Sequence, residues 1–364
     1  MDDLCYNKRN QSAYRADPEV IFLPSTPRPI HLLAPDEGQT VSLILPLNKT
    51  FFETGGNKKV GDFFDYHTYA KQNGDLSFGA PVVLRWDDPA SAHVLLADSP
   101  TLTNARAYDA VGGSTEIYNL MPGRTYFWQV QTETGLSNVR SFCTETALPR
   151  WIKADGMSNI RDLGGWKTAD GQVIRFGKIY RGCEMEFHYQ IEPTGRKVLA
   201  DELGIRTDLD LRAEAVGKIE ASALGMGVDF RLLPLLPDDR VFDSLESCRQ
   251  VFGVLADESV YPVYLHCWGG ADRTGTVAFL LGALLGVSYE DLCLDYELTS
   301  LSTCGDRSSN SERFQALWKR LQAYGEAGDD ANTLSEKFLR AIGVTDAEIK
   351  SIRRLLLVRP GEEK

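Results

Sequence analysis

One short stretch of the chain, HCWGGADRTG at residues 266–275, collects residue types that can bind an anion and attack it. If a strand ends before it and a helix follows, the backbone N–H groups from Trp268 to Arg273 can curl inward as an anion-binding nest. Gly269 and Gly270 allow the positive φ angles that such a curl needs. The following helix directs the positive end of its dipole at the same point. The stretch therefore predicts a phosphate-binding loop.

Two side chains of this loop suit chemistry on a bound phosphate. Arg273 offers a planar fork that matches two phosphate oxygens. Cys267 lies at the floor of the loop, where positive surroundings favour a thiolate over a thiol. A thiolate beneath a phosphate is placed for in-line attack on phosphorus. A lone cysteine beside a turn is more often a small buried residue, but the glycine and polar residues spaced around Cys267 favour a nucleophile.

The segments around the loop predict the elements that position it. The run YPVYLHC before the loop is strand-like, and TGTVAFLLGALLG after it is apolar all round, as in a buried helix. Strand-like GVDFRLLPLL and the amphipathic SERFQALWKRLQAYG, TLSEKFLRAIG and TDAEIKSIRRLLL complete the pattern, with a capping box at Thr345 and Glu348. We expect an α/β domain over residues 148–364, with a central, mostly parallel sheet flanked by helices.

Residues 21–147 have a different pattern. Short apolar or alternating runs such as TVSLILPL, PVVLRW, AHVLLAD, STEIYNL, TYFWQVQT and NVRSFCTE are separated by turn-rich pieces, which predicts an all-β sandwich. The run LMPGRTYFWQV and the tryptophan of VVLRW resemble the fibronectin type III or immunoglobulin-like pattern, with residues 51–80 as an insertion. Residues 1–20 are expected to form a polar tail. A domain of this kind is more often a spacer or docking module than a site of chemistry, and its partner is unknown.

The loop and its context resemble a known family. HCWGGADRTGT is similar to the HCxxGKDRTG loop of a bacterial tyrosine phosphatase family within the cysteine-dependent phosphatases. Four further motifs of that family follow its order: SNIRDLGGWKTADGQVIRFGKIYRG at 158–182, DLDLRAE at 208–214, LDYELTS at 294–300 and FLRAIGVT at 338–345. The resemblance spans roughly residues 150–357. It favours this family over a rhodanese-like sulfur transferase, which also carries a cysteine loop at a helix N-terminus.

The resemblance implies a role for each residue of the loop. Cys267 is the nucleophile and forms a phosphocysteine, while Arg273 holds the phosphate and stabilises charge in the transition state. His266 orients the loop, and Thr274 donates a hydrogen bond to the departing thiolate. The remaining residues expected to contact substrate are Trp268, Gly269, Gly270 and Ala271.

The general acid that protonates the leaving oxygen has several candidates. Asp238 in LLPDDR is similar to the acid loop of the wider superfamily, and its neighbour Asp239 is not separable from it by sequence. Asp210 occupies the position of this bacterial family's proposed acid, and Asp272 lies inside the loop itself. We expect the acid to be Asp272, Asp210 or Asp238.

Composition limits the partners. With 51 acidic and 39 basic residues the net charge is −12, which argues against nucleic acid as a partner. No apolar run is long enough to span a membrane. The seven cysteines are scattered without a disulfide pattern, and the five histidines without a metal-ligand pattern, so neither metal nor cofactor is expected. The expected substrate is a phosphorylated protein or a small phosphate ester.

Two alternative functions and the compartment stay open. The first alternative is a phosphoinositide or inositol-polyphosphate phosphatase, and the second is a phosphate-binding pseudophosphatase that acts as an interaction module. The first twenty residues contain no signal-peptide pattern. An immunoglobulin-like domain beside a phosphatase of bacterial type favours the cell envelope or secretion, whereas a reactive thiol favours the reducing cytosol.

Ala271 generates a prediction about substrate preference, because the family usually has lysine there. Without that cation the loop lacks a partner for the additional phosphates of a polyanionic substrate. Ala271→Lys should therefore raise activity on phosphoinositides relative to activity on a phosphotyrosine peptide, measured as phosphate release from each. An unchanged ratio would contradict this explanation.

Overall fold

The computed structural model describes residues 14–15, 29–57, 65–133 and 135–362. The predicted tail over residues 1–20 lies outside the described residues except for 14–15. The chain divides into two compact units, one of Met1–Leu43 with Ala80–Ala147 and one of Ile44–Gly79 with Leu148–Lys364. Among the described helices, none has the length and apolar character needed to cross a membrane.

The first unit is rich in β-structure and has two sheets. The larger sheet has the order β1-β6-β5-β8-β9-β3, formed by Tyr14–Arg15, Arg106–Ala110, Ala92–Ala97, Thr125–Thr132, Arg140–Thr144 and Gln39–Val41. The smaller has the order β2-β4-β7, formed by Leu32–Ala34, Val82–Trp86 and Ser114–Ile117. Leu84 and Ile117 of the smaller sheet share one hydrophobic core with Val94, Trp128 and Phe142 of the larger sheet.

Most strands of this unit lie where alternating apolar residues predicted them, but several differ. Strands β1, β2 and β6 were not predicted, because each is very short or offers only a weak alternation. The run TVSLILPL is a strand only at its start, and its end enters helix α1, Pro46–Glu53. Pro46 explains this change, since proline fits the first turn of a helix but cannot donate to a sheet ladder.

Residues 44–79 correct the predicted domain boundary. The segment lies between two strands of the first unit in sequence but belongs to the second unit. It carries α1 and α2 (Tyr66–Asn73), whose aromatic residues Phe51 and Tyr66 are buried in the core of the second unit. Their rings meet edge to face with centroids 5.1 Å apart. The hydrophobic effect therefore assigns this segment to the second unit.

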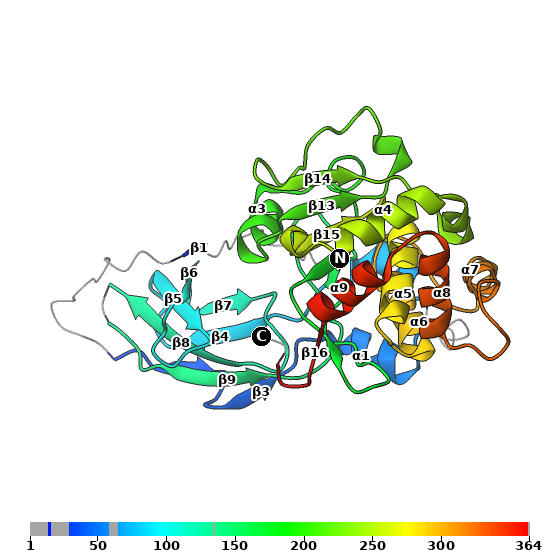
Figure 1. Cartoon of the computed structure of the whole chain (residues 1–364). Coiled ribbons are helices and arrows are strands. Elements are labelled where there is room, and N and C mark those ends of the chain that lie inside the picture. Colours follow the sequence, from blue (N-terminus) through cyan, green and yellow to red (C-terminus); the bar gives the residue numbers. More distant parts are fainter. Residues whose placement is uncertain (1–13, 16–28, 58–64, 134, 363–364) are drawn as a thin grey trace. The chain divides into compact units, whose positions relative to one another are not determined.

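The second unit is built on a five-stranded sheet with the order β10-β12-β15-β13-β14. The strands are Arg161–Asp162, Ile179–Gly182, Val263–His266, Thr207–Asp210 and Asp229–Leu232. All neighbours are parallel except β10, which runs antiparallel to β12. Figure 1 shows β13, β14 and β15 side by side. A separate pair joins β11, Val173–Ile174, to β16, Leu357–Val358.

The sheet separates two hydrophobic cores because strand side chains alternate between its faces. On β15, Val263 and Leu265 belong to the larger core, whereas Tyr264 belongs to the smaller one. The larger core includes residues of α4 (Leu245–Leu255), α5 (Arg273–Leu284), α6 (Tyr289–Glu297), α7 (Glu312–Gln322), α8 (Ala331–Ala341) and α9 (Asp346–Leu356). The smaller core includes Leu199 of the π-helical turn Val198–Glu202, which follows α3 (Pro193–Lys197). Short 3-10 turns occur at Ala213–Ala215, Asp238–Asp243, Glu258–Val260 and Leu298–Leu301.

Helix α5 is the buried helix that the sequence predicted. Every residue from Thr274 to Leu284 is buried, so solvent reaches only its first residue, Arg273. The capping box predicted at Thr345 and Glu348 is also present, at the start of α9. A helix enclosed by the core holds the loop at its N-terminus rigidly, because any shift of the helix would disturb the packing on all sides.

Candidate active site

The predicted phosphate-binding loop connects the central strand β15 to the buried helix α5. Strand β15 ends at His266, beside Gly182 of β12 and Asp210 of β13, at the carboxyl edge of the parallel strands. Helix α5 begins at Arg273. Ligands of parallel sheets bind at this edge, where loops and helix N-termini meet. Cys267 lies at the base of the loop and is only 2% exposed.

Three loop carbonyls accept hydrogen bonds from outside the loop. The pairs are Glu184 N with Trp268 O at 2.9 Å, Asn159 Nδ2 with Gly269 O at 2.9 Å, and Arg181 Nη2 with Gly270 O at 2.7 Å. Within the described part of the chain, no backbone N–H from Trp268 to Arg273 donates to a protein atom. The loop therefore directs its carbonyls to the protein and leaves its N–H groups for an anion.

Gly270 is required by this geometry. Its φ is +65°, and a Cβ added there would lie 2.3 Å from the carbonyl oxygen of Gly182. Backbone atoms cannot move aside as a flexible side chain can. The loop approaches strand β12 so closely that only glycine fits.

Arg181, which donates to the carbonyl oxygen of Gly270, belongs to a buried cluster with Arg161 and Asp295. Asp295 on α6 accepts from Nε of Arg161 at 2.9 Å and from Nη1 of Arg181 at 2.7 Å. Burial raises the pKa of Asp295, but the two positive charges outweigh burial and lower it overall. Burial and repulsion from Arg161 lower the pKa of Arg181 to about 10, so Arg181 stays charged at neutral pH.

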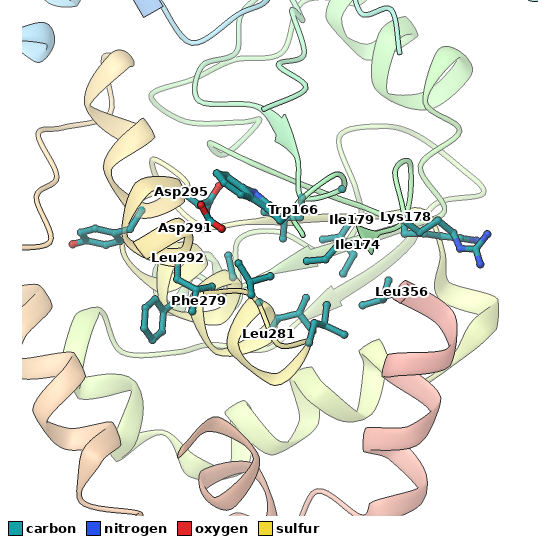
Figure 2. A pocket seen from close by; sticks show the side chains of 18 of the residues that line it. Trp166, Ile174, Lys178, Ile179, Phe279, Leu281, Asp291, Leu292, Asp295 and Leu356 are labelled. Carbon is teal, nitrogen blue, oxygen red and sulfur yellow. The ribbon is translucent and has the colours of Figure 1, made fainter. Parts of the chain in front are cut away.

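A small cavity lies beside this cluster (Figure 2). Its lining is mostly apolar and includes Trp166, Phe279, Leu281, Leu292 and, at one side, Asp295. The cavity measures about 20 Å³, room for about one water molecule. None of the loop residues from 266 to 273 lines it. The cavity therefore belongs to the packing behind the loop and not to the anion site.

His266 adds a positive charge beneath the loop. Its Nε2 lies 2.8 Å from Oδ1 of Asp208, and its Nδ1 lies 3.4 Å from the carbonyl oxygen of Cys267. Burial lowers the pKa of His266, but the charges of Asp208 and Asp210 and the hydrogen bond to Asp208 outweigh burial and raise it to about 9. His266 is therefore protonated at neutral pH and fixed against the backbone of Cys267.

Arg273 is fixed at the mouth of the loop by a carboxylate that the sequence analysis did not single out. Its Nη1 and Nη2 each donate to Glu214 at 2.8 Å. Burial lowers the pKa of Arg273, but Glu214 and Cys267 outweigh burial and raise it. The bond to Arg273 in turn lowers the pKa of Glu214 to about 2. Such a bidentate pair orients the guanidinium before any anion arrives.

Two of the predicted acids meet at the loop. The carboxyl groups of Asp238 and Asp272 lie close enough to interact electrostatically. Burial and the charge of Asp272 raise the pKa of Asp238 to about 6, although Arg313 and Arg307 oppose the rise. Arg307 Nε donates to Asp272 at 2.8 Å, and Arg313 Nε lies 3.2 Å from Asp238. Asp239 instead faces Arg320, at 3.8 Å, so the structure separates the two neighbours.

Asp210 lies in a different environment from this pair. It is fully buried and accepts hydrogen bonds from the backbone N–H of Arg212 at 2.8 Å and from its Nε at 2.9 Å. Arg212 also binds Glu184 and Glu186, so Asp210 is one part of a buried ion-pair cluster. A carboxylate that is shielded from solvent and held by a guanidinium is poorly placed to protonate a leaving group. The sequence did not reveal this burial, because a strand end can face either way.

The remaining loop residues have distinct surroundings. The indole of Trp268 is 38% exposed and lies edge to face with His188 and Tyr189, at centroid distances of 4.9 and 6.1 Å. Thr274 Oγ1 is buried and finds no hydrogen-bond partner among the described residues. Ala271 is buried as well and carries no charge. The positive charge near it comes from Arg307 and Arg313, which both bind Asp272.

In the described part of the chain, no His, Cys, Asp or Glu cluster is suited to hold a metal.

The sequence analysis did not name several residues that support the site. Asn159, Arg161 and Asp295 lie inside motifs that the sequence analysis quoted, and Glu214 ends the motif DLDLRAE, so their presence was signalled but not their partners. Arg307 belongs to no quoted motif, and Arg313 lies in the run SERFQALWKRLQAYG, which was quoted only as an amphipathic helix. Their role depends on the fold of a loop and a helix far from residue 267 in sequence.

Comparison with known proteins agrees with this geometry. The sequence model described as "Tyrosine phosphatase family" matches residues 152–358. A Cupriavidus necator protein whose name places it among the tyrosine-protein phosphatases is 27% identical over 176 residues. The match covers 39% of this chain and 60% of that protein, so it spans less than two thirds of the relative's length.

Two solved structures are distantly similar. The core catalytic domain of the PP-IP phosphatase Siw14 from S. cerevisiae, in complex with citrate, has a TM-score of 0.28 and 14% identity, covering 41% of this chain and 78% of that one. A second structure of the Siw14 catalytic core has a TM-score of 0.30 and 11% identity, covering 51% and 93%. Likeness at this level does not bear on the substrate of this chain.

Gly270 provides a test of the loop. Gly270→Ala should abolish binding of inorganic phosphate, measured by calorimetry, because the new Cβ meets the Gly182 carbonyl in addition to the left-handed backbone cost of about 1–2 kcal/mol. Gly204→Ala is a matched control, since Gly204 has the same φ of +65° but open space around it. Gly204→Ala should lose stability only. Equal phosphate binding by both variants would contradict the close approach.

Proposed function

The chain belongs to the tyrosine phosphatase family, and we propose that it is a cysteine-dependent phosphatase that hydrolyses phosphate monoesters through a phosphocysteine intermediate. The observation that carries the proposal is the loop itself. Its N–H groups have no protein acceptor among the described residues, and it surrounds Cys267. Arg273 is fixed at its mouth by Glu214. This combination suits a bound phosphate with a sulfur nucleophile beneath it.

In the first step, the thiolate of Cys267 attacks phosphorus opposite the ester oxygen. The new S–P bond forms as the P–O bond to the leaving group breaks. The loop N–H groups and Arg273 stabilise the charge on the other three phosphate oxygens. Asp238, whose pKa is raised to about 6, donates its proton to the leaving oxygen. The products are an alcohol or phenol and the phosphocysteine.

In the second step, water attacks the phosphocysteine. The carboxylate of Asp238 accepts a proton from the water, the new P–O bond forms, and the S–P bond breaks to release inorganic phosphate. Thr274 Oγ1 is free to donate to the departing thiolate, since it lacks another partner among the described residues. The cycle ends with the thiolate and with the proton restored to the acid pair.

We favour a phosphotyrosine-containing protein or another aryl phosphate as substrate. The support is an aromatic wall beside the loop, defined as Trp268, His188 and Tyr189. An aryl leaving group can pack against such a wall. A phosphoinositide or inositol polyphosphate is the second candidate, and the two arginines beside Asp272 favour it. Their charges are matched by Asp238 and Asp272, which leaves less positive charge for further phosphates.

We also propose that the first unit is a fibronectin type III or immunoglobulin-like β-sandwich. Its two sheets with a shared core support this assignment. So does Tyr126, whose hydroxyl accepts a hydrogen bond from the backbone N–H of Met121 at 2.9 Å, the arrangement of a tyrosine corner. A docking or spacer role fits such a unit, and its partner is unknown.

Hydrolysis of p-nitrophenyl phosphate tests the proposed function. The reduced wild-type protein should release p-nitrophenol with or without a chelator, and Cys267→Ser should lower the rate by at least about a thousandfold. Cys143→Ser is the control, because Cys143 lies on β9 in the first unit. If the folded, reduced wild-type protein binds inorganic phosphate but releases no product, the pseudophosphatase alternative holds.

The acid pair generates a pH prediction. A general acid works only when protonated, so kcat/KM should fall as pH rises through about 6, the pKa of Asp238. Asp238→Asn should remove this basic limb and lower kcat/KM for phenyl phosphate by about 10²–10⁴-fold. Asp272→Asn removes a like charge, lowers the pKa of Asp238 and should move the limb to lower pH. Asp239→Asn, which faces Arg320, should leave the profile unchanged, and a shift there would reject the assignment.

A further inference from the structure

The segment of residues 44–79 reaches the active site at two places. It leaves the β-rich unit after β3 and returns to it at β4, but it folds as part of the second unit. Phe51 and Tyr66 anchor it in the core of that unit. We call its described residues, 44–57 and 65–79, the inserted segment. Its polar residues, unlike these anchors, bind residues that in turn contact the phosphate-binding loop.

The first connection runs from Asp75 to Gly269. The Asp75 carboxylate accepts from the backbone N–H of Ser77 at 2.6 Å and also from the hydroxyl groups of Ser77 and Ser158. Ser77 Oγ accepts from the backbone N–H of Asn159 at 2.8 Å. Asn159 Nδ2 then donates to Gly269 O, one of the three outward carbonyls of the loop, at 2.9 Å.

Asn159 needs this support because its backbone is unusual. Its φ is +59°, a left-handed conformation that is uncommon outside glycine. The hydrogen bond from its N–H to Ser77 stabilises that conformation from the side of the inserted segment. Asn159 also accepts from Nη1 of Arg161 at 2.7 Å, so its amide orientation is fixed from two directions. The inserted segment thereby helps to hold Gly269 O away from the anion site.

The second connection runs from Asn57 to the acid pair. Asn57 Nδ2 lies 2.6 Å from Oδ1 of Asp306, 2.8 Å from the carbonyl oxygen of Arg307 and 3.2 Å from Oγ of Ser300. These bonds fix the backbone at Arg307. The Arg307 side chain then donates its Nε to Asp272 at 2.8 Å. Arg307 thus connects Asn57 to Asp272, whose charge raises the pKa of Asp238.

The two connections meet different parts of the site. The Ser77 route ends at a loop carbonyl, so its loss disturbs phosphate binding. The Asn57 route ends at Arg307, which lowers the pKa of Asp238, so its loss disturbs proton donation. The groups that face Asp238 are Asp272 of the loop, Arg307, Arg313 of α7 and Tyr296 of α6. Only Arg307 among these is held by the inserted segment.

We propose that the inserted segment is a positioning element of the active site, in which Ser77 sets the phosphate-binding loop and Asn57 sets the acid pair. The inference rests on the proposed phosphatase function. In sequence, these residues lie between two strands of the β-rich unit. The inference assigns them a direct part in the geometry of the second unit. A misplacement of about 1 Å at a reacting centre is enough to cost about a hundredfold in rate.

The test uses the full chain with p-nitrophenyl phosphate and phenyl phosphate as substrates. Asn57→Ala should lower kcat about tenfold and move the basic limb of kcat/KM to higher pH, because a loosened Arg307 no longer lowers the pKa of Asp238. Asn57→Asp keeps the side-chain volume but loses the amide donor and places a carboxylate opposite Asp306, so it should show the same changes as Asn57→Ala. It replaces the alanine variant if that variant does not fold.

Ser77→Ala should instead raise KM and the inhibition constant of inorganic phosphate about tenfold, with the basic limb unchanged. Ser77→Thr retains the hydroxyl and should restore phosphate affinity. Asn73→Ala is the matched control: Asn73 lies on α2 of the same segment, and among the described residues its Nδ2 donates only to the nearby carbonyl oxygen of Tyr69, at 3.2 Å. This control should match the wild-type protein in every constant.

The outcomes separate this inference from the proposed function. An inactive wild-type protein, or an active Cys267→Ser, would reject the proposed function whatever the inserted segment does. An active wild-type protein whose folded Asn57 and Ser77 variants keep the wild-type kcat, KM and pH profile would overturn the positioning role alone. Equal losses in Asn73→Ala would also overturn it, since they would show only a general need for the segment.

Discussion

Consecutive backbone N–H groups can converge on one anion only if the carbonyls between them are held away from it. Each peptide unit carries both groups, and an unpaired buried carbonyl is costly, so the outward carbonyls need donors of their own. In this protein those donors come from Glu184, Asn159 and Arg181. The anion site is therefore built as much from its outer hydrogen bonds as from the loop.

The outer donors explain why so much charge is buried behind the loop. Arg181 can donate to Gly270 O only because Asp295 compensates its charge, and Asp295 is shared with Arg161. Removing Asp295 would leave two buried arginines without a compensating charge, which costs several kcal/mol. Removing Asp208 would likewise leave His266 without its partner. Both clusters contact the loop or the strand that leads into it.

The proposed general acid lies at the rim of the loop. Burial and the charge of Asp272 raise the pKa of Asp238, and two arginines limit that rise. The wall of Trp268, His188 and Tyr189 also lies beside the loop. The proposed nucleophile, phosphate-binding arginine and general acid thus come from the loop, from α5 and from the turn at Asp238. Their relative placement depends on how α7, the residues around Arg307 and the inserted segment pack.

The sequence by itself determined the local features: the loop with Cys267 and Arg273, the buried helix behind it, the capping box of α9 and most strands of the first unit. These depend on residue types at short spacing, which the printed chain displays directly. The tertiary structure alone decided which aspartates meet, that Asp210 is buried with Arg212, that Glu214 fixes Arg273, and that residues 44–79 belong to the second unit. The physical reason is that charge pairing and burial depend on distances between residues far apart in sequence. Hydrophobic pattern and spacing specify each element, but not which side chains the packed elements bring together.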